Sequence, residues 1–201
     1  MLKKILIGLL AVLAIFFAIV ASRPETFEIK RSLDINASPE VVASQITNFH
    51  KWEAWSPWEK QDAAMKKTFD GPDDGVGAHY AWDSAKVGSG EMKVTDVKPG
   101  EKVGIDLHFT KPFETQNRVD FELVKSGDKT NVSWVMTGKN SFAGKAMSVF
   151  MDMDKMVGPD FEKGLAALKD ASEKAQAAAV VPVAAPPPAE GDAAATDAGT
   201  P

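Results

Sequence analysis

The chain has 201 residues, a formal net charge of −5 and an isoelectric point near 5.3, which excludes a general basic surface for binding nucleic acid. It contains no cysteine, and this excludes disulfides, thiolate catalysis and cysteine-based zinc sites. With 44% hydrophobic and 25% charged residues, the composition is that of a globular protein with one main core.

The first segment is directed to a membrane. An uncharged apolar run over residues 5–21 follows two lysines and covers about 26 Å as a helix, close to the ~30 Å hydrocarbon core of a bilayer. We expect residues 1–22 to be an uncleaved single-pass anchor in the cell membrane, with the following domain extracytoplasmic, in the periplasm. Arg23, just past the run, weakens the assignment of orientation. A cleaved signal peptide is the alternative, because Ala21 and Ser22 suit a cleavage site; the protein would then be secreted.

The last 26 residues have a different composition from the rest of the chain. Residues 176–201 are rich in alanine and proline, contain no lysine, arginine or aromatic residue, and carry few large apolar side chains. Such a segment cannot bury enough surface to offset its conformational entropy, so we expect a disordered tail. This leaves residues 25–175 as a single folded domain.

The domain begins with strand spacing and then changes to a helix. In residues 27–35 apolar side chains alternate with polar ones, which is typical of a half-buried strand. Ser38, Pro39 and Glu40 then match the cap, the first position and the first turn of a helix. After this helix, clusters of Gly, Pro and Asp separate six short alternating runs, which predict an antiparallel meander. The runs are MKKTFDG, GAHYAWDS, GEMKVTDV, KVGIDLHFT, NRVDFELV and TNVSWVMTG.

The final segment returns to helical spacing. Its apolar side chains fall near one stripe: Met147, Phe150, Met151, Val157, Phe161, Leu165 and Leu168. Gly158 and Pro159 interrupt the stripe, and Pro159 removes a backbone donor, so we expect a kink or a new helix start there. The order of elements therefore predicts an α+β fold, in which a curved antiparallel sheet covers its apolar face with a long C-terminal helix.

This pattern resembles the helix-grip fold of the START-like superfamily (SRPBCC), often labelled polyketide cyclase/dehydrase and lipid transport. Three segments carry the resemblance: INASPEVVASQITNFHKWEAWSPW at 35–58, GEMKVTDVKPGEKVGIDL at 90–107 and MVGPDFEKGLAALK at 156–169. The resemblance implies a hydrophobic cavity between the sheet and the C-terminal helix. The superfamily includes lipid carriers, cyclases and co-chaperones, so the resemblance is more specific for fold than for function.

Strand parity argues against a catalytic centre. Alternation places His79 and His108 on the outer face of the sheet, together with Asp83 and Asp106, while His50 lies near the end of the first helix. These side chains do not converge as a metal site or as a general acid and base. We therefore predict no catalytic residue, no bound metal and no cofactor.

The inward register supplies the candidate ligand-binding residues. They are Tyr80, Trp82, Ile105, Leu107, Phe121, Trp134, Met136, Phe150, Met151 and Val157. Arg31 shares the inward parity of its strand and is a candidate for an acidic ligand group, with a side chain that reaches water as the alternative. Of the three tryptophans spaced three apart, Trp52 and Trp55 are assigned to packing and Trp58 to the rim of the cavity. Ordinary gap-filling in a core is the alternative for the methionines of the last segment.

We expect a membrane-anchored domain that binds a small or medium hydrophobic or amphipathic molecule, including a lipid, without catalysing a reaction. One alternative is a cyclase or dehydratase-like enzyme, which needs an inward-facing acid or base such as His79 or Asp83. A second alternative is a protein-interaction module similar to the co-chaperone branch, which a core without a cavity would favour. The sequence predicts no nucleic-acid partner and does not identify a protein partner.

Overall fold

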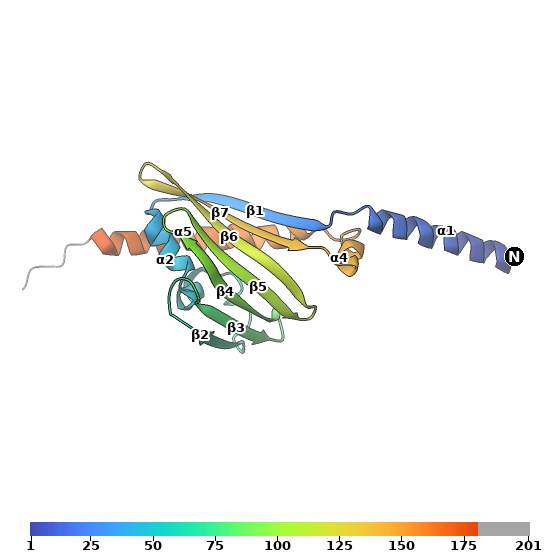
Figure 1. Ribbon diagram of the computed structural model, residues 1–201, viewed down its shortest axis with the longest axis horizontal. Coiled ribbons are helices and arrows are strands. Elements are labelled where there is room, and N and C mark those ends of the chain that lie inside the picture. The colour runs from blue at the N-terminus through green and yellow to red at the C-terminus, as the bar shows by residue number, and fades with distance from the viewer. Residues whose placement is uncertain (181–201) are drawn as a thin grey trace, which may run out of the picture.

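The computed structural model describes residues 1–180 and contains an N-terminal helix that extends away from one α+β domain (Figure 1). Helix α1 (Leu2–Ala21) has a mean hydropathy of 2.8 and is long and apolar enough to cross a membrane. A signal sequence near the N-terminus meets the same criteria. Most of α1 is exposed, although Val20 near its end is completely buried.

A single seven-stranded antiparallel sheet forms the body of the domain. Its strands are β1 (Thr26–Ile35), β2 (Lys66–Asp70), β3 (His79–Ser84), β4 (Gly88–Lys98), β5 (Lys102–Lys111), β6 (Thr115–Ser126) and β7 (Lys129–Lys139). The spatial order is β1-β7-β6-β5-β4-β3-β2, so the meander of six consecutive strands is confirmed and the opening strand pairs with the last one. Strand β1 pairs with β7 over its whole length, from Thr26 opposite Lys139 to Ile35 opposite Thr130.

Short helices connect the opening strand to the meander. Helix α2 (Pro39–Ile46) begins as predicted, with Ser38 as its cap and Pro39 at its first position. A 3-10 turn η1 (Phe49–Lys51) and a single helical turn α3 (Trp52–Trp55) follow. The indole N–H groups of Trp52 and Trp55 donate to the carbonyls of Ile46 and Gln45 at 2.9 and 3.0 Å, which fixes α3 against α2.

The C-terminal segment differs from its predicted form. Helix α4 (Phe142–Met147) ends before Phe150, and helix α5 (Met153–Val180) continues through Gly158 and Pro159 without a new start. The alternative of a new helix start there was therefore wrong, because α5 is one helix with Pro159 inside it. Gly158 instead leaves room for another side chain, because a Cβ at this position would overlap the guanidinium of Arg31.

Helix α5 covers one face of the sheet and completes the core (Figure 1). Phe161, Leu165 and Leu168 lie on its buried side with exposed fractions of at most 1%. Gly164 allows the helix to approach closely, since a Cβ there would lie 2.7 Å from Cζ3 of Trp134. The helix also extends through the first five residues of the segment predicted as a tail, and residues 181–201 lie outside the described part of the chain.

Candidate functional site

A cavity of about 310 Å³ lies between the sheet, α3 and the first turns of α5. Sixteen of its twenty lining residues are hydrophobic or aromatic, which makes it an apolar pocket with a few polar positions. The polar ones are Ser56, Glu59, Thr115 and Asn117. An enclosed, mostly apolar space with a few converging polar groups is the usual form of a small-molecule site.

The cavity reaches solvent at one end of the sheet. Among its lining residues Thr115 and Met153 are exposed, while Phe27, Val87 and Phe109 are half-buried. All five lie where strands or helices begin or end on the same side. The strand pairs define this end of the sheet from β1 to β4. Thr26 lies opposite Lys139, Gly138 opposite Asn117, Thr115 opposite Phe109, and Lys111 opposite Ser89. The mouth of the cavity is therefore at the end of the sheet where the chain arrives from α1.

Aromatic rings form the wall beneath α5. Trp134 of β7 stacks on Phe161 with centroids 4.2 Å apart, and Trp58 meets both rings edge-on. Trp52 completes this wall from α3. The indole N–H of Trp134 is buried and has no hydrogen-bond acceptor within the described residues. Such stacked and edge-on pairs stabilise a rigid apolar surface beyond the area that they bury.

One buried carboxylate interrupts this apolar wall. The side chain of Glu59 is only 6% exposed, accepts a 2.8 Å hydrogen bond from the hydroxyl of Tyr80 and forms an ion pair with Lys67. Burial, followed by the contact with Glu59, raises the pKa of Tyr80 far above its usual value, so its hydroxyl stays protonated. Both residues line the cavity, and the hydroxyl of Tyr80 already donates its hydrogen bond to Glu59.

The structure brings together most of the residues predicted to bind a ligand. Those that line the cavity are Tyr80, Trp82, Leu107, Trp134, Met136 and Val157. Trp58, predicted at the rim, lines the wall beneath α5, where it contacts Trp134 and Phe161. Ile105 and Phe121 have the predicted inward parity but are completely buried in the core and do not reach the cavity surface. Phe150 and Met151 are also outside it, because they lie in the turn before α5 with exposed fractions of 79% and 43%.

Arg31 points inward as predicted but does not line the cavity. Its guanidinium makes two hydrogen bonds to Asp154, at 2.8 and 2.9 Å, and one to Glu162 at 2.8 Å. These contacts, that with Asp154 first, raise the pKa of Arg31 above its ordinary value. Arg31 therefore connects β1 to α5, and its donors are occupied by protein carboxylates rather than directed at the cavity.

Glu59 lines the cavity but was not predicted from the sequence. It follows Trp58 in a turn without strand or helix periodicity, and no sequence pattern indicated that it faces inward. Phe27, Met92, Phe109 and Val119 were also missed, although each shares the inward parity of a predicted strand and could have been identified by it.

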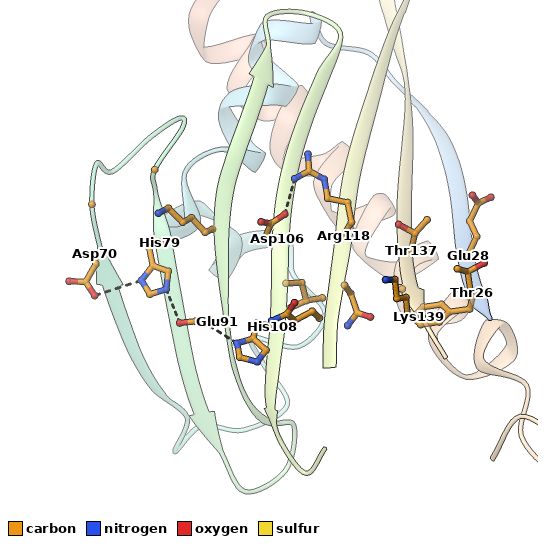
Figure 2. A pocket seen from close by; sticks show the side chains of 18 residues that line it. Thr26, Glu28, Asp70, His79, Glu91, Asp106, His108, Arg118, Thr137 and Lys139 are labelled. Atoms are coloured by element: carbon orange, nitrogen blue, oxygen red, sulfur yellow. Dashed lines mark hydrogen bonds and ion pairs between the residues drawn. The ribbon is translucent and has the colours of Figure 1, made fainter. Parts of the chain in front are cut away.

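A second depression lies on the opposite, outer face of the sheet (Figure 2). As parity predicts, His79 and His108 face outward, where each approaches a different oxygen of Glu91 at 3.2 and 3.3 Å. The two imidazoles, His108 first, lower the pKa of Glu91. Arg118 pairs in the same depression with Asp106 at 2.9 Å. Among residues 1–180 no three His, Asp or Glu side chains are arranged to hold a metal ion.

The outer depression is larger, about 1350 Å³, but it is open to solvent and lined by charged groups that already pair with one another. It offers an apolar molecule no protection from water. Asp83, the other candidate acid, bonds to Ser89 and Lys111 and lines neither space. The apolar cavity beneath α5 is therefore the better candidate for a ligand site.

Solved structures of other proteins share this fold. The Aha1 dimer from Colwellia psychrerythraea superposes with a TM-score of 0.52 at 21% identity, over 73% of this chain and 96% of that one. The Mll3558 protein from Rhizobium loti gives a TM-score of 0.55 at 18% identity, over 73% and 96%. DynU16, a protein of the dynemicin biosynthetic locus, gives 0.52 at 12% identity, over 77% and 49%. At these identities the likeness concerns the fold alone.

No curated protein sequence matches the chain. A sequence model of the family described as polyketide cyclase / dehydrase and lipid transport matches residues 26–173, which is the whole domain from the first strand into α5. The chain therefore belongs to the polyketide cyclase / dehydrase and lipid transport family.

Proposed function

We propose that the protein binds a small hydrophobic or amphipathic molecule in the cavity between its sheet and α5, while α1 holds it at a membrane. The observation that carries this proposal is the apolar cavity itself, with one polar pair in its wall. A ligand is held there mainly because its apolar surface leaves water, at about 25 cal/mol per Å². A solid core, which would favour a pure interaction module, is not what this domain has.

The volume restricts the size of the ligand. At about 310 Å³ the cavity is roughly twice the ~150 Å³ apolar cavity that holds one benzene ring. It accommodates two fused rings or part of a single acyl chain. It is too small for the two chains of a phospholipid, each of which spans half of a ~30 Å hydrocarbon core.

The polar pair restricts the chemistry of the ligand. The hydroxyl of Tyr80 stays protonated and already donates its hydrogen bond to Glu59, so the oxygens of both side chains are left as acceptors. They fit a ligand group that donates a hydrogen bond, such as a hydroxyl or an amine. An anionic head group is disfavoured, because the ammonium of Lys67 is already paired with the carboxylate of Glu59 and is not free to hold a second anion.

Calorimetric titration of the chain from Pro24 onward tests the proposal. The panel contains two-ring and single-chain amphipaths in matched hydroxyl, amine and carboxylate forms. We expect one-to-one binding of the hydroxyl or amine form with a negative change in heat capacity, the mark of apolar burial. Glu59→Gln should reduce the preference for the amine over the hydroxyl form. If no member of the panel binds, or if the carboxylate form binds best, the proposal is wrong.

A second candidate function is proton transfer on a bound substrate, as in a cyclase or dehydratase. Glu59 favours it, because it supplies the inward-facing carboxylate that such chemistry needs. In this role Glu59 would accept a proton from the substrate while Lys67 and Tyr80 hold its orientation. The variant Glu59→Gln distinguishes the two functions. It should abolish turnover of a polyketide-like substrate but leave binding of a hydroxyl ligand largely intact.

A further inference from the structure

Helix α1 makes specific aromatic contacts with the domain near its C-terminal end. Phe16 stacks on Phe150 and Phe17 stacks on Phe142, with ring centroids 6.2 and 5.8 Å apart. Phe16 lies five residues before Ala21, which is about 8 Å along a helix. Helix α4 and the turn after it therefore reach down beside the apolar helix rather than stopping at its end.

The connection between α1 and the domain is also held by polar contacts. The side-chain amide of Asn140 donates to the carbonyl of Pro24 at 3.1 Å, and its backbone N–H donates to the carbonyl of Glu25 at 2.8 Å. Lys145 of α4 pairs with the side chain of Glu25 at 3.9 Å. These contacts fix the linker against the start of α4, so the orientation of the domain relative to α1 is defined.

Exposed apolar side chains gather at this same end of the domain. Among residues 22–179 nine large hydrophobic side chains are exposed. Of these nine, Val76 and Val124 lie elsewhere in the domain and Met156 lies further along α5. The other six form what we call the apolar rim: Phe113, Phe142, Met147, Phe150, Met151 and Met153. Phe113 comes from the loop between β5 and β6, and the rest come from α4 and the following segment. Such a gathering on an otherwise polar domain marks a contact surface.

We propose that the apolar rim inserts into the surface of the bilayer that α1 spans. The ligand, whose binding rests on the proposed function, then passes directly between lipid and cavity. Lipid is the partner of the apolar rim, because the aromatic rings of the rim stack on the rings of the apolar helix α1 and form one continuous surface with them. Side chains of this kind enter a bilayer by about 5–10 Å, which matches the ~8 Å overlap with α1.

The mouth of the cavity lies within this rim. Met153 belongs both to the cavity lining and to the rim, and Thr115 of the mouth lies two residues after Phe113. A hydrophobic ligand that left the cavity here would meet acyl chains before it met water. The domain would thus avoid the cost of moving an apolar molecule through solvent.

Depth-dependent fluorescence quenching tests the insertion without any ligand. Because the chain has no cysteine, Ala143→Cys in α4 and Ser126→Cys at the distant end of β6 each create a single labelling site. Both positions are exposed. The full-length labelled proteins are placed in phosphatidylcholine and phosphatidylglycerol vesicles that contain spin-labelled lipids. We expect strong loss of fluorescence at position 143 and little at position 126.

Equal quenching at the two positions, or none at either, would overturn the insertion. Passage of the ligand is tested with a brominated single-chain alcohol loaded into vesicles, since bromine quenches the tryptophans that line the cavity. Replacing Phe142 and Phe150 together by serine should slow this uptake several-fold, whereas the matched surface change Val124→Ser should not. Uptake at the wild-type rate by the double variant would contradict direct passage. Quenching at position 143 without calorimetric binding would contradict the proposed function alone.

Discussion

The hydroxyl of Tyr80 donates a 2.8 Å hydrogen bond to Oε1 of Glu59, and this contact joins strand β3 to the turn after α3. The same carboxylate pairs with Lys67 on the neighbouring strand β2. Three elements thus meet at one buried charge in the cavity wall. This pair gives the cavity its polarity, and the stability of that wall depends on it.

We predict that Tyr80→Phe lowers the free energy of unfolding by about 1.5–3 kcal/mol, because it leaves a buried carboxylate without its neutral donor. Urea unfolding of the chain from Pro24 onward measures this. In a Glu59→Gln background the same change should cost less, since no charge remains to be satisfied. An equal cost in both backgrounds would show that the hydrogen bond does not contribute to stability.

The link between Arg31 and Asp154 predicts a dependence of stability on pH. The hydrogen bonds from Arg31 lower the pKa of Asp154 in the folded state. A lowered folded-state pKa of Asp154 stabilises the fold at pH values above the ordinary carboxyl pKa of about 4. This contribution disappears as the pH falls through the folded-state pKa. Asp154→Asn should therefore unfold more easily at pH 7 and differ less from the wild type at pH 3. Asp128→Asn, in the exposed turn between β6 and β7, is the control and should show no such convergence.

Gly164 provides a packing prediction. An added Cβ would lie 2.7 Å from Trp134 and 3.2 Å from Pro57, so Gly164→Ala should destabilise by about 1–3 kcal/mol through overpacking. This loss from overpacking outweighs or cancels the gain in helix propensity of about 1 kcal/mol that a change from glycine to alanine otherwise brings. At Gly144 of α4 the nearest atom lies at 3.5 Å, so Gly144→Ala should keep that gain. Thermal unfolding of both variants decides the matter, and a stabilised Gly164→Ala would refute the close approach of α5.

The sequence predicts the sheet well because each strand carries its own signal. Alternation identifies every strand and places Tyr80, Leu107 and Met136 inward without any knowledge of the fold. The cap at Ser38 is equally local. The mostly apolar character of the cavity follows from the same parity.

Features that depend on contacts between distant segments could not be predicted in this way. Glu59 lies in an irregular turn, and only the fold brings it to Tyr80 and Lys67. Parity shows that Phe121 is inward but does not distinguish core from cavity surface. The packing role of Gly158 could not be predicted, because the side chain that fills its space, Arg31, is 127 positions away in the chain.

Native mass spectrometry of the gently purified chain from Pro24 onward tests the central claim most directly. The wild type should carry an extra mass that organic solvent removes. Val119→Trp, which fills the cavity from β6, should lack it, while Val124→Trp, on the same strand but exposed, should retain it. Urea unfolding confirms that both variants remain folded. A bare wild-type mass, or an equal adduct on the filled variant, would contradict a ligand held in this cavity.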